Sequence, residues 1–210
     1  MDIDSYIEAH ISPEPEPLAR LYRHTHLYHL YPRMCTDHTQ GRLLKMLTAM
    51  IRPMRILELG TFTGYSTLCM AEGMPRGCTI DTVEINDESE DELRATFDGD
   101  PRGTDIRLHI GDALDIVPQL DGRWDMVFID ANKRNYTDYL DMVLPRVYPG
   151  GWILADNTLW DGHILSEETS RDAQSRAIAA FNDRVAADPR LEKVILPVRD
   201  GLTIMRKLTE

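Results

Sequence analysis

Two apolar stretches of the sequence lead directly into oxygen-bearing side chains. The stretch at 124–130 ends in Asp130, and the stretch at 151–155 leads into Asp156 and Asn157. Neighbouring strands lie about 4.8 Å apart, so adjacent parallel strands would bring the two carboxylates and the amide together. Because two close anions repel, a hard divalent cation would fit between them, and Mg²⁺ would keep positions open for water or substrate. The alternative is structural: Asp156 caps a helix and Asp130 bonds backbone amides.

A glycine-bearing turn is the second candidate site. It begins at the end of the apolar stretch 55–59 and runs from Glu58 to Ser66, with glycines at 60 and 64. Glycine allows a nucleoside or amino-acid group to approach the backbone without meeting a Cβ. The GxxxG spacing differs from the GxGxxG of dinucleotide binders, which argues against a pyrophosphate ligand. A purely structural strand-to-helix turn would have the same spacing.

Two later strand ends offer further ligand contacts, since open α/β sheets bind ligands beyond the carboxyl ends of their strands. Glu84 ends the stretch 79–84, about twenty residues past the glycine turn, where an acidic side chain accepts hydrogen bonds from ribose hydroxyls. It could instead be a surface carboxylate, as the polar run at 87–92 indicates for its neighbours. Gly111-Asp112-Ala113 follows the third stretch and could flank an adenine.

These residues need a sheet that brings strand ends together. Short apolar runs at 55–59, 79–84, 105–110, 124–130 and 151–155 alternate with helical stretches, which predicts a doubly wound, mostly parallel sheet. Two more runs, 193–198 and 202–208, flank Arg199-Asp200-Gly201, and a DG turn is typical of a hairpin. The expected fold is an α/β, Rossmann-like sheet of seven strands with a C-terminal antiparallel hairpin.

Helices are expected around this sheet. Tyr139, Met142, Val143 and Val147 share one helical face, and the PGG at 149–151 is predicted to end that helix. A longer helix is predicted over 170–187, and an amphipathic one over 39–51. The first fifty residues read as helices interrupted at 13–17. We therefore expect one domain over 1–210, with a helical N-terminal part (1–52) and a Rossmann-like core (53–210).

The composition narrows the possible partners. The 210 residues carry a net charge of -12, which argues against nucleic acid and anionic membranes because both require a basic surface. No apolar run approaches the roughly 18 residues of a membrane span, and the first ten residues lack the layout of a signal peptide. We expect a cytoplasmic protein that acts on a small molecule.

Cysteines and histidines give weaker signals. Cys35, Cys69 and Cys78 are odd in number and lack CxxC spacing, so we expect reduced, mostly buried thiols rather than disulfides or a zinc site. His24, His26 and His29 lie close together in the sequence and could suggest a metal site. Neither an HxxxH pair nor an acidic companion accompanies them in the sequence, so polar positions around an early helix or loop are the preferred interpretation.

The stretch ILELGTFTGYSTLCMA resembles the first motif of the class I S-adenosylmethionine (SAM)-dependent methyltransferases. In particular, it resembles the cation-dependent O-methyltransferases related to caffeoyl-CoA and catechol O-methyltransferases. The likeness extends through FIDANKRNY (128–136), YPGGWILADNTLWDG (148–162) and LPVRDGLTIMRK, from about 31 to 207. It implies SAM as cofactor and methyl transfer to a hydroxyl. Members of the family are commonly dimers, so it also implies a homodimer.

The resemblance assigns roles to individual positions. It implies that Asp130, Asp156 and Asn157 bind a divalent cation, Mg²⁺ first and Ca²⁺ or Mn²⁺ as alternatives. It implies that Lys133 acts as general base beside Asp130, and that Trp160 walls the acceptor pocket, although a core tryptophan would be equally compatible with the sequence. The implied cofactor-binding residues are Met34, Glu58, Gly60, Thr61, Phe62, Gly64, Tyr65, Ser66, Glu84, Ile85, Gly111, Asp112, Ala113, Asp130 and Tyr139.

One departure and two alternatives stay open. Many family members read D-A-D-K where this chain has Asn132 before Lys133, which puts the strength and selectivity of cation binding in doubt. The expected acceptor is a hydroxylated aromatic with a vicinal diol, and its specificity is expected to depend on 22–37 and 160–169. The alternatives are a metal-independent N- or O-methyltransferase of the same fold and a non-catalytic nucleoside-binding domain. Loss of activity in a chelator would distinguish a cation-dependent O-methyltransferase from the metal-independent alternative.

Overall fold

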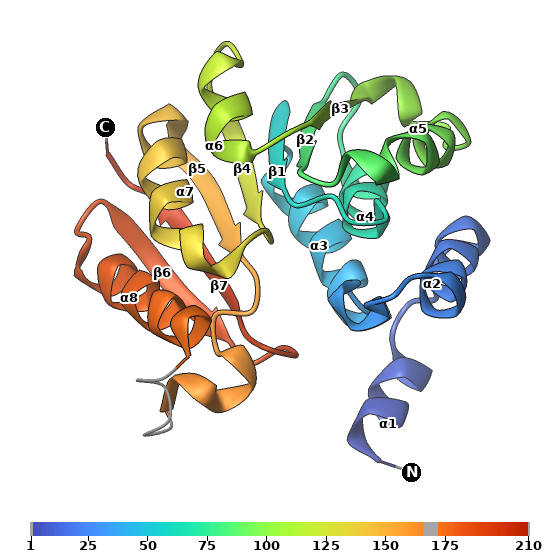
Figure 1. Cartoon of the computed structure of the whole chain (residues 1–210), viewed down its shortest axis with the longest axis horizontal. Helices are drawn as coiled ribbons and strands as arrows, with labels where there is room; N and C mark the ends of the chain where they lie inside the picture. The colour runs from blue at the N-terminus through green and yellow to red at the C-terminus, as the bar shows by residue number, and fades with distance from the viewer. Residues whose placement is uncertain (1, 166–171, 210) are drawn as a thin grey trace.

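A seven-stranded sheet runs through the centre of the computed structural model, which describes residues 2–165 and 172–209 (Figure 1). The strand order is β3-β2-β1-β4-β5-β7-β6. Strands β1 to β5 are parallel, and β7 is antiparallel to both β5 and β6. The predicted fold class is confirmed. The strands are β1 (Arg55–Leu59), β2 (Thr79–Glu84), β3 (Ile106–Ile110), β4 (Trp124–Ile129), β5 (Val147–Ala155), β6 (Leu191–Leu196) and β7 (Leu202–Lys207).

Helices pack on both sides of this sheet. The described helices are α1 (Ile3–His10), α2 (Glu16–Tyr28), α3 (His38–Ile51), α4 (Tyr65–Gly73), α5 (Glu90–Asp98), α6 (Ala113–Ile116), α7 (Tyr136–Val143) and α8 (Ala173–Ala187), of which α1 and α2 lie away from the sheet (Figure 1). Short 3-10 turns are η1 (Pro32–Met34), η2 (Asp87–Ser89), η3 (Gly103–Asp105), η4 (Val117–Gln119), η5 (Lys133–Asn135), η6 (Leu144–Arg146) and η7 (Trp160–Leu165). Within the described ranges, no helix is both long and apolar enough to cross a membrane.

Alternate residues of each central strand face opposite helical layers, as the period of two requires. Ile56, Met126 and Leu154 point toward α3 and α4, and their neighbours Leu57, Val127 and Ile153 point toward α7 and α8. In Figure 1, α7 and α8 lie together over β5, β6 and β7, whereas α3, α4 and α5 lie together toward the right. All six strand residues are fully buried, which agrees with the continuous apolar character of parallel strands covered on both faces.

The helix after β4 is shorter than its sequence pattern predicted. Helix α7 ends at Val143, and Val147 is the first residue of β5, paired with Trp124. The segment 149–151 lies inside β5, beside an irregularity in the pairing with β4, and does not end a helix. Both predictions were wrong. The missed signal is Pro145, which has no N–H to donate to the next α-helical hydrogen bond and therefore ends the α-helix early.

Two other boundaries bear on the site. Asp172 caps α8 by accepting hydrogen bonds from the backbone N–H groups of Gln174 and Ser175, so the described helix starts at Ala173. The first residues of the predicted helix, 170 and 171, lie outside the described residues. The hairpin turn at 199–201 is present, with φ of 49° at Arg199 and 90° at Gly201, but β6 runs from 191 to 196 rather than from 193 to 198.

Candidate active site

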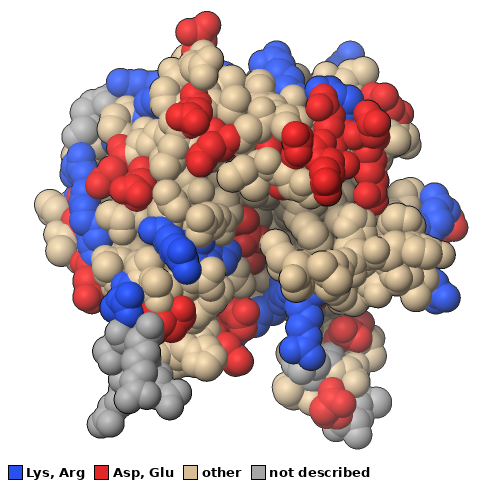
Figure 2. All heavy atoms as spheres, in the orientation of Figure 1, with Lys and Arg blue, Asp and Glu red and all other residues tan. Residues whose placement is uncertain are grey.

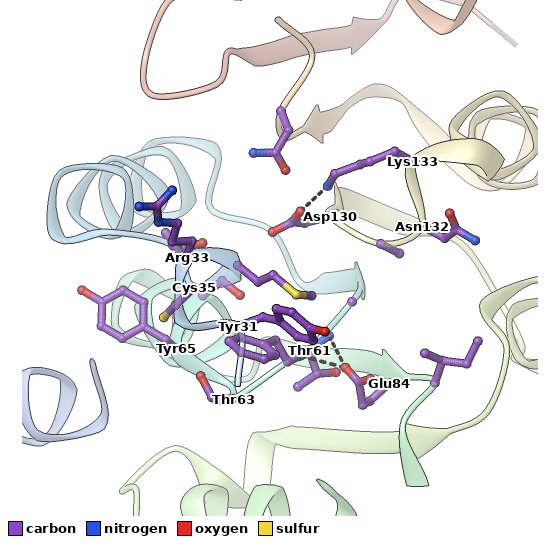
Figure 3. Close-up of a pocket in the computed structure, with 18 of the residues that line it drawn as sticks. Tyr31, Arg33, Cys35, Thr61, Thr63, Tyr65, Glu84, Asp130, Asn132 and Lys133 are labelled. Atoms are coloured by element: carbon purple, nitrogen blue, oxygen red, sulfur yellow. Dashed lines mark hydrogen bonds and ion pairs between the residues drawn. The ribbon is translucent and has the colours of Figure 1, made fainter. Parts of the chain in front are cut away.

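A cavity of about 810 Å³ opens at the carboxyl ends of the parallel strands (Figure 3). It lies where the strand order reverses between β1 and β4, the expected ligand position in an open α/β sheet. Segment 30–36 and the hairpin turn at 199–200 close it from the other side. The predicted residues that line it are Met34, Gly60, Thr61, Phe62, Tyr65, Ser66, Glu84, Ile85, Gly111, Asp112, Ala113, Asp130, Lys133, Tyr139, Asn157 and Trp160.

The turn after β1 passes close under the loop that follows β4. Gly60 has φ of 94°, and a Cβ at this position would collide with the backbone carbonyl of Asp130. The Gly60 N–H donates to the Val83 carbonyl at 2.9 Å, which fixes the turn against the end of β2. Glycine is therefore required here for two reasons, the left-handed φ and the close backbone approach.

Glu84 fastens this turn from the neighbouring strand. Its Oε2 accepts hydrogen bonds from the backbone N–H groups of Thr61 at 3.2 Å and Phe62 at 2.8 Å, while its Oε1 accepts from Asn86 N–H at 2.9 Å. Figure 3 shows the Glu84 carboxylate beside Thr61 at one end of the cavity. Ile85 next to it is exposed and lines the same end. The carboxylate is thus held in place at the edge of the cavity.

Glu58 and Gly64 lie behind the turn rather than on the cavity wall. Glu58 is fully buried and accepts hydrogen bonds from the hydroxyls of Ser66 at 2.6 Å, Thr82 at 2.7 Å and Thr67. Burial raises the pKa of its carboxyl to about 7, against the three hydroxyl donors that lower it. Gly64, with φ of 83°, starts α4. Glu58 and Gly64 therefore stabilise the shape of the turn.

The loop after β3 forms the next part of the wall. Gly111 has φ of 143°, and its N–H donates to the Glu84 carbonyl at 2.8 Å. Asp112 caps the short helix α6 through the backbone N–H of Leu114 at 2.9 Å. Ala113 follows with little side chain. Segment 111–113 and Ile85 border one end of the cavity with small, apolar and acidic groups. Small and apolar groups suit a flat heterocycle, and a carboxylate can accept hydrogen bonds from its exocyclic N–H groups.

Lys133 joins Asp130 and Tyr136 at the other end of the cavity. Its Nζ lies 2.7 Å from Asp130 Oδ1 and donates a hydrogen bond to the Tyr136 hydroxyl at 2.7 Å. Only 12% of the Lys133 side chain and 17% of the Asp130 side chain are exposed. Turn η5, one helical turn after β4, brings the lysine back over the carboxylate (Figure 3). The ammonium therefore compensates the Asp130 charge.

Asp156 enters the same region from β5, the strand next to β4. The Asp156 N–H donates a hydrogen bond to the carbonyl of Ile129 at 3.0 Å. Asp156 therefore lies beside the end of β4, where Asp130 follows Ile129. Asp156 is 1% exposed. Burial and the negative charge of Asp130 raise the pKa of its carboxyl to about 7. Asn157 follows with φ of 57° and lines the cavity.

The residues around Asp156 fit a cation. The carboxylates of Asp130 and Asp156 repel each other, and the side-chain amide of Gln40, which is buried beside Asp156, has no hydrogen-bond partner among the described residues. The Asn157 amide nitrogen is turned toward Asp200, at 3.4 Å from its carboxylate, so the amide oxygen would be the atom available to a cation. Carboxylate and amide oxygens are the ligands that Mg²⁺ and Ca²⁺ prefer.

Asn132 lines the cavity but takes no part in the contacts between Asp130, Lys133 and Tyr136. Asn132 is exposed, and its side-chain oxygen accepts a hydrogen bond from the Arg134 N–H at 3.2 Å. Figure 3 shows its side chain on the far side of the loop from Asp130 and Lys133. The amide acts as a turn cap in this structure, a role that asparagine and aspartate share.

Several residues at the site carried no clear sequence signal. Tyr136, Gln40 and Arg33 were not singled out, and Arg199 and Asp200 were interpreted only as a hairpin turn. The Asp200 carbonyl accepts hydrogen bonds from the N–H groups of Leu159 at 2.7 Å and Trp160 at 3.1 Å. Arg199 pairs with Asp37 at 3.3 Å. The hairpin therefore supports both Trp160 and the N-terminal segment that closes the cavity.

A nucleoside-sized cavity next to paired carboxylates and a lysine, at the switch point of a parallel sheet, is typical of α/β enzymes that hold a nucleoside-bearing cofactor beside a second substrate. A model of the O-methyltransferase family matches residues 8–208. The chain therefore belongs to the O-methyltransferase family, and it is an S-adenosylmethionine-dependent O-methyltransferase.

Individual relatives agree with this assignment. Caffeoyl-CoA O-methyltransferase 1 of Eucalyptus globulus is 34% identical, over 97% of this chain and 87% of that protein. The O-methyltransferase TomG of Streptomyces achromogenes, solved in complex with SAM, has a TM-score of 0.91 at 26% identity and covers 99% of this chain and 96% of its own. The O-methyltransferase from Bacillus cereus, in complex with SAH, has a TM-score of 0.87 at 28% identity, covering 98% and 96%.

Proposed function

We propose that this enzyme methylates one hydroxyl of a catechol-type aromatic acceptor that is held on a divalent cation by Asp130, Asp156 and Asn157. The observation that carries the proposal is the convergence of Asp130 and Asp156 from the ends of neighbouring parallel strands. Burial, and next the negative charge of Asp130, raise the pKa of the Asp156 carboxyl. A vicinal diol suits such a site because two adjacent oxygens can chelate one ion. The caffeoyl-CoA O-methyltransferases among the relatives support an aromatic acceptor.

The cavity has room for both substrates. Its volume of about 810 Å³ lies near the upper part of the roughly 300–1,000 Å³ range of ligand pockets. SAM is proposed to lie along Glu84 and 111–113, with its ribose hydroxyls donating to the Glu84 carboxylate. The acceptor is proposed to occupy the end near Lys133, Asn157 and Trp160. The methyl group would then lie between the two ends.

The reaction is a displacement at carbon. The acceptor oxygen forms a bond to the methyl carbon of the sulfonium as the carbon–sulfur bond breaks, and S-adenosylhomocysteine leaves. In its neutral amine form, Lys133 Nζ is placed to take the hydroxyl proton, and the ammonium that results is held by Asp130 and Tyr136. A bound cation would supply Lewis-acid stabilisation of the developing oxyanion. Holding the two reactants in line can lower the activation barrier by roughly 7–11 kcal/mol.

An acceptor screen with labelled SAM tests this proposal. Catechol, caffeoyl and flavonoid acceptors are incubated with the enzyme before and after dialysis against EDTA, and Mg²⁺ is then restored. We expect methylation of diol acceptors, loss of turnover after dialysis and recovery with Mg²⁺ alone. Full turnover by the dialysed enzyme would favour the metal-independent alternative, in which Asp130 and Asp156 serve structure only.

A further inference from the structure

Two histidines at the end of α2 meet a glutamate of α5. The Nε2 atom of His29 lies 3.0 Å from Glu92 Oε1, and the Nδ1 atom of His24 lies 3.5 Å from the same oxygen. One ligand atom from each of the three residues falls within 4.8 Å of the others. The acidic companion that the sequence around the histidines lacked is thus supplied from 63 residues further along the chain.

The fold holds these groups together from both sides. His29 ends α2 in an extended conformation, with φ of -91° and ψ of 146°, which turns its ring edge-on to Phe62 with the centroids 5.5 Å apart. Thr25, between the two histidines, is fully buried and donates a hydrogen bond to the Thr63 hydroxyl at 3.1 Å. The end of α2 is therefore fixed against the turn that follows β1.

We propose that His24, His29 and Glu92 form a binding site for a zinc-type transition-metal ion that ties α2 to α5. Two imidazole nitrogens and one carboxylate oxygen are a ligand set that Zn²⁺ accepts, at about 2.0–2.2 Å and with tetrahedral geometry, leaving the fourth position to water. Nitrogen ligands suit Zn²⁺, Ni²⁺, Co²⁺ and Cu²⁺, whereas Mg²⁺ prefers oxygen. The site thus differs in chemistry from the all-oxygen group at Asp130, Asp156 and Asn157.

The distances require only small side-chain movements. Ligand atoms about 2.1 Å from a tetrahedral ion lie roughly 3.4 Å from one another, and the two imidazole-to-carboxylate distances of 3.0 and 3.5 Å bracket this value. The His24 and Glu92 side chains are 49% and 40% exposed, so both can rotate and an ion can enter from solvent. The His29 side chain, at 20% exposed, provides the fixed point.

The surrounding charge favours a cation. Acidic side chains gather over α5 and the turn before it, at the upper right of Figure 2: Asp87, Glu88, Glu90, Asp91 and Glu92. A surface of one sign raises the local concentration of counter-ions. Segment 30–36, which lines the cavity, begins directly after His29, so an ion on His29 would hold the start of this segment against α5.

Metal binding to the intact enzyme tests the proposal. The enzyme is stripped with EDTA and placed in excess Mg²⁺ to occupy the oxygen-ligand site, and Zn²⁺ is titrated in competition with a chromophoric chelator. Co²⁺ replaces Zn²⁺ in a parallel titration that is monitored by visible absorption. We expect one Zn²⁺ per chain, a visible Co²⁺ spectrum of tetrahedral intensity and a higher melting temperature with Zn²⁺ than with Mg²⁺ alone.

Matched variants decide whether these three residues are responsible. His29→Ala and Glu92→Gln should each weaken Zn²⁺ binding by more than the roughly 10–100-fold that loss of an outer-shell partner costs. His24→Ala should weaken Zn²⁺ binding in the same way, and folding should be preserved because the His24 side chain is half-exposed. His26→Ala and Glu90→Gln are the controls, since His26 bonds the Tyr22 carbonyl and Glu90 pairs with Arg94.

Two outcomes would overturn the inference: no Zn²⁺ binding by the wild type in excess Mg²⁺, or equal binding by the wild type and the three ligand variants. Asp156→Ala should keep the Zn²⁺ site while losing Mg²⁺-dependent turnover. The test is therefore independent of the proposed reaction, and either proposal can fail alone.

Discussion

Lys133 Nζ donates a hydrogen bond to the Tyr136 hydroxyl at 2.7 Å, and that hydroxyl donates in turn to the backbone carbonyl of Asp156 at 2.9 Å. The proposed base on η5, just after β4, is therefore linked through one buried phenol to the residue that follows β5 and carries the second carboxylate. Burial and the charges of Asp130 and Asp156 raise the pKa of Tyr136 well above its usual range. The phenol thus stays neutral and keeps both hydrogen bonds.

Replacing Tyr136 by phenylalanine should show whether its hydroxyl positions Lys133 for catalysis or only stabilises the fold. Loss of a buried hydrogen bond to a charged group costs about 1.5–3 kcal/mol, so we expect a lower melting temperature. Because Lys133 loses one of its two partners, we also expect kcat to fall about tenfold with the Kd for SAM unchanged. Tyr148→Phe, at an exposed position, is the control. An unchanged kcat would restrict Tyr136 to a structural role.

Lys133→Ala tests the proton acceptor directly. A general base contributes roughly 10²–10⁴-fold to the rate, and we expect a loss of this size in kcat, while SAM binding measured by calorimetry persists. Arg134→Ala on the same turn, exposed to solvent, should keep normal turnover. If the Lys133 variant methylated catechols at the wild-type rate, the proton would have another acceptor.

The two glycines at 60 and 150 form a matched pair. Both have left-handed φ, 94° and 82°, but a Cβ at Gly60 meets the Asp130 carbonyl while one at Gly150 meets nothing within 4 Å. Gly150→Ala should cost about 1–2 kcal/mol from backbone strain. Gly60→Ala should cost roughly 1–3 kcal/mol more from the collision and weaken SAM binding. Equal free energies of unfolding for the two variants would contradict the close approach described here.

Glu58 predicts a pH dependence of stability. Burial raises the pKa of its carboxyl to about 7 in the folded protein, from an ordinary value of 4.5. The folded state therefore binds the proton more tightly than the unfolded state, so the destabilising charge appears as the pH rises from about 4.5 to 7 and is complete above 7. Glu58→Gln lacks this charge. Its melting temperature relative to the wild type should rise over that interval and then level off, whereas a constant difference would mean that Glu58 titrates normally.

The parts of the fold that follow from local pattern were predictable from the sequence. Each parallel strand is a short apolar run, and because its ladder is regular the residue after it is placed at the sheet edge. Asp130, Asp156 and Glu84 were found in this way. The end of α7 at Val143 and the start of β5 at Val147 were missed because the helical spacing of apolar residues continues across Pro145.

The rest of the site depends on contacts between distant parts of the chain, which periodicity does not encode. Glu92 meets His29 across 63 residues, and Arg199 meets Asp37 across a still longer separation. Tyr136 reads in the sequence as one more apolar position of α7, although its hydroxyl ties two strand ends together. Glu58 was expected to contact the cofactor, but the hydroxyls of α4 turn its carboxylate inward.

The proposed role of the cation is tested most directly by the rate of catechol methylation at increasing Mg²⁺ concentration, using EDTA-stripped wild type and Asp156→Asn. This substitution keeps the shape of the side chain and removes its charge. The wild type should rise from a negligible rate to saturation, and Asp156→Asn should need at least about tenfold more Mg²⁺. A stripped wild-type enzyme that turns over at its full rate without added metal would contradict the account.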